Sequence, residues 1–245
     1  MQLDFEVDLI LSKAKELCAK KVALQFPEGL IRHSFSIAET LRTRMPGLKV
    51  FILGETTYGA CCIDDTAAKA LGVRLLVHFG HAGVVPASIT DDGTISVIYI
   101  TAAARSWDEI SATESISKFL GPSWASRVAL VSTAQFSKKL PRLCENLKSR
   151  KIESFLPRIG ELGPGEILGC TAPTLPTDVG AIIFIGDGRF HVEAAAMANP
   201  GMRTLRYDPY TKSVSDQPLD APRLAQVRAR EIEAARAAKV VGIAF

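Results

Sequence analysis

The stretch "KVALQF", residues 21–26, recurs almost unchanged as "RVALVS", residues 127–132. Both are short, uninterrupted apolar runs rich in β-branched residues. Such runs are typical of strands buried on both faces of a parallel sheet. The two copies lie 106 positions apart, which indicates that an α/β unit of about this length is repeated within the chain.

Other segments fit the same interpretation. Further buried strands are expected at 48–53 ("LKVFIL"), 73–79 ("VRLLVHF"), 95–100 ("ISVIYI") and 179–187 ("VGAIIFIGD"). Helical spacing occurs between them, at 31–44, 63–71, 138–150 and 188–199. Alternating strands and helices predict parallel sheets with right-handed crossovers. The fold class is therefore α/β, with tandem homologous domains that each contain a small parallel sheet flanked by helices.

The repeat also contains a cysteine at a corresponding place. Cys61 and Cys170 are 109 positions apart, and each comes about 40 residues after the first strand of its unit. A later strand in each unit ends in a glycine turn, at Gly80 and Gly186. These correspondences predict two units, 1–105 carrying Cys61 and 106–220 carrying Cys170.

A third unit is expected to begin near the end of the chain. Helices precede the first strand at about 6–19 and 106–120, and a similar helix at 221–239 is followed by "VVGIAF", residues 240–245. An unpaired apolar strand of this kind invites aggregation. Either the chain is truncated within a third repeat at 221–245, or this strand pairs with another partner. We expect truncation or an incomplete gene product.

Composition excludes several classes of protein. The 245 residues are 47% apolar and 22% charged, with a net charge of +3, so no strong field would attract nucleic acid or a membrane. Five cysteines are too few and too scattered for a disulfide scaffold. Acidic residues interrupt the apolar N-terminal segment, which is therefore no signal peptide or spanning helix. We expect a cytoplasmic protein.

Cys61 and Cys170 are the candidate metal ligands. A lone cysteine is usually a small packing residue, but matching positions on the carboxyl side of the strands favour a shared site. Gly59 permits close approach of a ligand, and the helix that follows Cys61 favours a thiolate. The other cysteines are predicted to pack, with Cys62 pointing away from Cys61: these are Cys18, Cys62 and Cys144.

Two further motifs have open interpretations. His78 and His81 in "HFGH" could complete a zinc site with the cysteines, but their spacing matches no zinc finger or ribbon. We expect one histidine to line a pocket and the other to be satisfied by packing. "IGDGRFH" (185–191) could bind an anion at a helix N-terminus with the help of Arg189, or be simply a tight turn. "RYDPYTK" (206–212) reads as a turn outside the core.

Several motifs together resemble one family. "TYGACCIDD", "LVHFGH", "LGCTAP", "GDGRFHVEAAAMANP" and "RYDPYTK" occur in this order between residues 57 and 212, and they are similar to the diphthamide-synthesis radical enzymes, above all their eukaryotic catalytic subunit. The resemblance implies three homologous α/β domains, each giving one cysteine to a 4Fe–4S cluster. The third domain would be missing here.

The resemblance also implies a reaction. A 3-amino-3-carboxypropyl group moves from S-adenosylmethionine to a histidine of translation elongation factor 2, by radical chemistry at the 4Fe–4S cluster. This would make the protein a transferase, the first of diphthamide biosynthesis. Implied partners are elongation factor 2, a homologous second subunit and an electron-donor protein. Thiolates suit iron–sulfur clusters.

Residue by residue, Cys61 and Cys170 match the first and second cluster ligands of the family. We assign co-substrate binding to His81 and to the turn Gly186, Asp187, Gly188 and Arg189. Ala82 and Gly83 depart from the family, which usually has serine and cysteine there. Without the third ligand, the chain alone is expected to be poorly active. The alternative is a non-catalytic scaffold subunit of the same complex.

Overall fold

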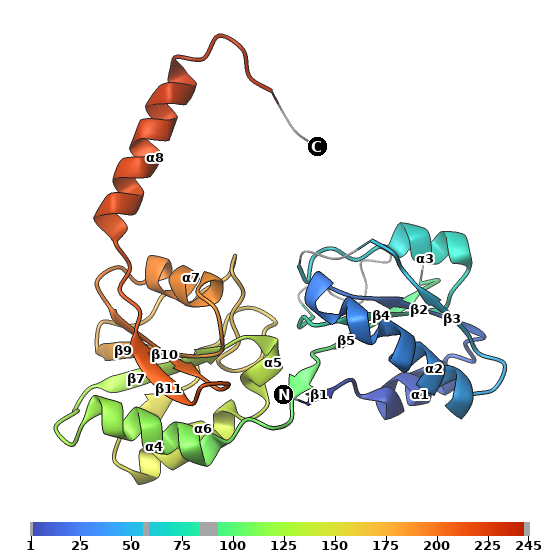
Figure 1. Cartoon of the computed structure of the whole chain (residues 1–245), viewed down its shortest axis with the longest axis horizontal. Helices are drawn as coiled ribbons and strands as arrows, with labels where there is room; N and C mark the ends of the chain where they lie inside the picture. Colours follow the sequence, from blue (N-terminus) through green and yellow to red (C-terminus); the bar gives the residue numbers. More distant parts are fainter. Residues whose placement is uncertain (1, 56–58, 84–92, 243–245) are drawn as a thin grey trace.

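The computed structural model describes residues 2–55, 59–83 and 93–242, and Figure 1 shows them as two lobes, each built around one sheet. The first sheet has the strand order β3-β2-β4-β5, and all its neighbouring strands are parallel. Its strands are β2 (Lys21–Gln25), β3 (Lys49–Ile52), β4 (Leu75–Phe79) and β5 (Ser96–Ile100). Its helical segments are α1 (Val7–Glu16), η1 (Glu28–His33), α2 (Ser34–Arg44) and α3 (Asp65–Leu71).

Helices cover both faces of this sheet because its strands are apolar on both sides. Val22, Leu24 and Val77 pack on one face with α1 and α2. Ala23 and Leu76 pack on the other face with α3. Burying both faces of a parallel sheet accounts for the uninterrupted apolar runs of its sequence.

The second sheet has the order β11-β10-β9-β7-β8. Its strands are β7 (Arg127–Ser132), β8 (Ser154–Phe155), β9 (Val179–Ile185), β10 (Arg203–Asp208) and β11 (Ser213–Asp216). The first four repeat the order of the first sheet, and β11 adds an antiparallel edge. Its helices are α4 (Glu109–Leu120), α5 (Ala134–Ser137), α6 (Leu140–Ser149) and α7 (Phe190–Ala198). The core on one face includes residues of α4 and α6, and the core on the other includes residues of α7.

A detail of hydrogen bonding repeats as well. The Gly80 amide after β4 donates to Ile100 O at 2.7 Å, and the Gly186 amide after β9 donates to Tyr207 O at 3.0 Å. Each bond extends the sheet one residue beyond the central strand. Gly80 has φ of +84°, a conformation that glycine adopts without strain. The chain therefore turns at equivalent points of both sheets.

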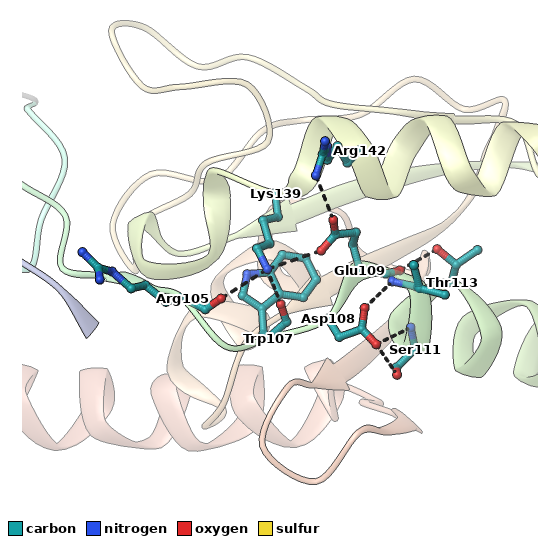
Figure 2. Close-up of polar contacts among 9 residues, drawn as sticks. Arg105, Trp107, Asp108, Glu109, Ser111, Thr113, Lys139 and Arg142 are labelled. Atoms are coloured by element: carbon teal, nitrogen blue, oxygen red, sulfur yellow. Dashed lines mark hydrogen bonds and ion pairs between the residues drawn. The ribbon is translucent and has the colours of Figure 1, made fainter. Parts of the chain in front are cut away.

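The connector between the sheets, residues 101–108, is fixed by polar contacts (Figure 2). Lys139 Nζ donates to Trp107 O at 2.5 Å and to Arg105 O at 3.3 Å, and lies 3.4 Å from Glu109 Oε2. Asp108 caps α4 by accepting from the amides of Ile110 and Ser111. The first residues of the second lobe are thus held by a lysine that precedes α6.

The N-terminal strand also joins the two lobes. β1 (Leu3–Asp4) pairs antiparallel with β6 (Ala103–Ala104), which lies within the connector. Asp4 Oδ1 accepts from Arg105 at 2.9 Å, and Glu6 Oε1 accepts from Lys138 at 2.5 Å. A small apolar cluster of Ala82, Ala134 and Leu162 makes a further contact between the lobes.

Two expectations from the sequence are wrong. Tyr207 is 1% exposed and belongs to the core of the second lobe, because "RYD" continues β10 before the turn begins. Cys18 lies beyond the end of α1, with φ of +48°, and it is exposed rather than packed. The strand expected over 240–245 is tested only in part: no strand forms over residues 240–242 after α8 (Ala221–Arg236), and residues 243–245 lie outside the described residues. In Figure 1, α8 projects away from the second lobe.

No helix in the described ranges is both long and apolar enough to cross a membrane. The prediction of parallel sheets flanked by helices is confirmed. The domain limits 1–105, 106–220 and 221–245 stay a prediction.

Candidate functional site

The two predicted ligand cysteines lie in corresponding loops. Cys61 lies in the loop that follows β3, and Cys170 lies in the loop that follows β8. These strands occupy the same position in the two sheets. Both thiols are exposed and free. They are therefore available to a ligand outside the protein core. Residues 56–58, which belong to the motif before Cys61, lie outside the described residues.

The pKa of the Cys61 thiol is raised mainly by its neighbour Cys62. The hydrogen bond with Cys62 and then the charge of Cys62 raise the pKa of the Cys61 thiol, and the charge of Cys170 raises it further. This influence of Cys170 reaches Cys61 from the other lobe. A cation placed between these sulfurs would have the opposite effect and favour the thiolates.

Cys62 does not point away from Cys61, so that prediction is wrong. Its Sγ lies 3.9 Å from the Sγ of Cys61, and its side chain is exposed. The Cys62 amide donates to Gly59 O at 3.0 Å, which closes a tight turn and leaves both sulfurs at the surface. The packing prediction is confirmed for Cys144, which is 7% exposed and donates to Ser154 O at 3.2 Å.

His78 and His81 are hydrogen-bonded to each other. His78 Nε2 lies 2.9 Å from His81 Nδ1, and His78 is fully buried at the end of β4. Burial, together with the charge of His81, lowers the pKa of His78 to about 4. Burial also lowers the pKa of His81, and His191 of the second lobe adds to this effect. Both imidazoles are therefore neutral near pH 7.

The turn 186–189 leads into α7, and its polar groups already form hydrogen bonds with other residues of the chain. Arg189 donates to Glu193 Oε1 at 2.9 Å, and Gly188 O accepts from Arg206 at 3.0 Å. Gly188 has φ of +68°, a conformation that glycine adopts without strain, which explains why glycine occupies this position. An anion at this turn would have to compete with Glu193 for the Arg189 guanidinium.

A cavity of about 380 Å³ lies between the lobes. Its lining includes Pro27 and Gly80 from the first lobe and Gln135, Asp187 and Tyr210 from the second. These residues follow the carboxyl ends of strands in both sheets, where ligands of open parallel sheets bind.

Three residues near these loops were not expected from the sequence. Gln25 is 2% exposed and contacts both Cys62 and His78. Glu166 is 5% exposed, its Oε1 has no hydrogen-bond partner in the described structure, and burial raises its pKa. His191 stacks on Phe184, with the ring centroids 6.4 Å apart. A polar residue at the end of a buried strand, as Gln25 is, was the available signal.

The side chains of the described ranges do not form a group of three or more histidine, cysteine or acidic residues that could hold a metal ion. The zinc hypothesis therefore has no ligand set among these residues. Cys61 and Cys170 fit an iron–sulfur cluster in donor chemistry, because both are exposed free thiols, but two thiols supply only part of its coordination.

The diphthamide synthesis protein family model matches residues 26–245. The chain belongs to this family. Among its relatives is subunit 1 of 2-(3-amino-3-carboxypropyl)histidine synthase from Bos taurus, which is 42% identical over 98% of this chain and 53% of the relative. The Homo sapiens subunit 1 is 40% identical over the same shares. This diphthamide synthesis family member thus spans about half the length of the curated relatives it matches.

Solved structures agree. Dph2 from Pyrococcus horikoshii superposes with a TM-score of 0.80 and 32% identity, over 97% of this chain and 67% of that one. A second structure of the same protein, with a 4Fe-4S cluster, gives a TM-score of 0.78 over 94% of this chain and 66% of that one. The resemblance of the sequence motifs to this family is confirmed.

Proposed function

We propose that the protein containing this chain is a 2-(3-amino-3-carboxypropyl)histidine synthase subunit. It transfers the 3-amino-3-carboxypropyl group of S-adenosylmethionine to a histidine of translation elongation factor 2. The observation that supports this best is the position of Cys61 and Cys170 in corresponding loops of two sheets, in a chain of this family.

In this proposal Cys61 and Cys170 are two thiolate ligands of a 4Fe–4S cluster. When bound, such a cluster supplies the electron for cleaving the bond between the sulfur and the γ-carbon of the co-substrate. Residues of this chain would bind and orient the co-substrate. Asp187, in the wall of the cavity between the lobes, and Arg189 at the start of α7 offer charges for the amino and carboxylate groups of S-adenosylmethionine.

The proposal also covers the repeated units of the chain and the further components of the enzyme. Units 1–105 and 106–220 are homologous repeats, which the shared strand order supports, and 221–245 begins a third. A third thiolate, a homologous second subunit and an electron-donor protein would complete the enzyme in the cytoplasm.

Anaerobic reconstitution with iron and sulfide tests the ligand assignment. We expect a brown protein whose iron and sulfide content falls by at least about half in Cys61→Ser and in Cys170→Ser, because each removes a soft ligand. Cys18→Ser is the matched control, since Cys18 is also exposed. Equal iron content in all three variants would contradict the assignment.

The second candidate is a scaffold subunit without its own cluster. It is favoured because the described ranges contain no group of three or more histidine, cysteine or acidic residues that could hold a metal ion. Co-purification with a cluster-bearing subunit, at unchanged yield in Cys61→Ser, would support this candidate over the first.

A further inference from the structure

A series of hydrogen bonds links the cysteine loop of the first lobe to His81. Gln25 Nε2 donates to Cys62 O at 3.1 Å, and Gln25 Oε1 lies 3.1 Å from His78 Nδ1. His78 Nε2 in turn lies 2.9 Å from His81 Nδ1. The whole path runs from the end of β2 across the end of β4, and Gln25 and His78 are shielded from water.

The carbonyl of Cys62 fixes the direction of every bond in this series. A carbonyl only accepts, so the amide nitrogen of Gln25 faces it and the amide oxygen faces His78. That oxygen also only accepts, so Nδ1 of His78 carries a proton. The neutral His78 then has a lone pair on Nε2, and Nδ1 of His81 must donate to it.

The proton on Nδ1 of His81 determines the state of its other ring nitrogen, Nε2. With its proton on Nδ1, a neutral His81 has an unprotonated Nε2, and no residue in the described ranges hydrogen-bonds to that atom. His81 is partly exposed, and its chain neighbour Ala82 packs against Ala134 and Leu162 of the second lobe. An acceptor is thus presented at the side where the two lobes meet.

We propose that Gln25 and His78 are positioning residues that hold His81 in the Nδ1-protonated tautomer, so that its Nε2 accepts a hydrogen bond from an N–H group of the bound ligand. The nature of that ligand rests on the proposed function. Two N–H donors then qualify, the ammonium group of S-adenosylmethionine and the imidazole N–H of a substrate histidine.

Histidine-selective ¹⁵N NMR of this chain at neutral pH tests the tautomer without iron. The chain has four histidines, and His33→Gln, His81→Gln and His191→Gln assign the signals. We expect His81 to show a protonated Nδ1 and an unprotonated Nε2. In Gln25→Leu, which keeps the bulk of the side chain but removes both contacts, His81 should become a mixture of tautomers. A His81 protonated on Nε2 in the wild type, or unchanged in Gln25→Leu, would overturn the proposal.

Two probes then test the acceptor role. S-adenosylmethionine and imidazole are added separately at millimolar concentration while the His81 Nε2 signal is followed. A shift with the first identifies the ammonium donor, and a shift with imidazole alone identifies the histidine donor. No shift with either probe would overturn the acceptor role.

Affinity for the probe that binds gives the decisive comparison. His81→Phe should weaken it about tenfold, the loss of one hydrogen bond to a charged or polar group, while His81→Gln should retain most of it because its amide oxygen accepts. Equal loss in both variants would contradict a specific acceptor. Failure of cluster assembly would leave all these readings intact, so the two proposals fail separately.

Discussion

His78 is a titratable side chain without contact to solvent, and this has a consequence for stability. Burial lowers its pKa from 6.5 to about 4 in the folded protein. A histidine whose pKa is lowered by folding stabilises the native state above its unfolded pKa. That stabilisation is lost as the pH falls from 6.5 toward 4.

We therefore expect acid to destabilise the chain through His78. Between pH 7.5 and pH 5 the free energy of unfolding should fall by about 2 kcal/mol from this group. Urea denaturation of the wild type and His78→Gln at both pH values measures it. The variant is less stable at pH 7.5, but its loss on acidification should be smaller by this amount. Parallel losses in the two proteins would contradict the prediction.

At the scale of the element, the segment before Cys170 is held by Gly165. Its amide donates to Pro157 O at 2.7 Å, and its carbonyl accepts from Ser132 at 2.8 Å. Gly165 has φ of +75°, and a Cβ there would lie 2.7 Å from Leu140 Cδ1 and 2.8 Å from Leu130 O. The residue thus fixes the loop of Cys170 to the end of β7.

Gly165→Ala should destabilise the second lobe by about 2–4 kcal/mol, from the strained φ and the overlap with backbone. Gly160→Ala is the matched control, because Gly160 has φ of +49° with no atom within 4 Å of the added Cβ. It should cost about 1 kcal/mol. Thermal unfolding measures both, and equal effects would show that the close contacts at Gly165 are relieved at no cost.

Sequence patterns predicted the long elements well because these elements are buried on one or both faces. The apolar runs at β2, β4 and β9 fall within the predicted strands. The hairpin β10–β11 was missed, because its strands, RTLRYD and SVSD, are mostly polar and contain no apolar run. The site was harder to predict, because the contact of Gln25 with the carbonyl of Cys62 joins segments distant in sequence.

At the scale of the whole molecule, Cys61 and Cys170 belong to different lobes, in loops that follow corresponding edge strands of the two sheets. A short thiol-to-thiol crosslinker should join them if both loops reach one shared site, as the proposed function requires. We expect a crosslinked species in a Cys18→Ser/Cys62→Ser protein, detected by mass spectrometry after proteolysis. The control is Cys61→Ser/Cys62→Ser, in which the exposed cysteines are Cys18 and Cys170. Equal crosslinking in both proteins would mean that the lobes do not hold Cys61 near Cys170.

The connector around Lys139 sets the spacing of the two lobes. Its backbone carbonyls at Arg105 and Trp107 are bound by one ammonium group, and its start is paired with β1. A segment tied in this way cannot lengthen or rotate freely. Adding a single residue between Ala104 and Trp107 would move one cysteine loop relative to the other, while each sheet kept its own core. The separation of the two cysteine loops, and therefore the size of a ligand that could bridge them, is thus set by a few connector residues that lie outside both loops.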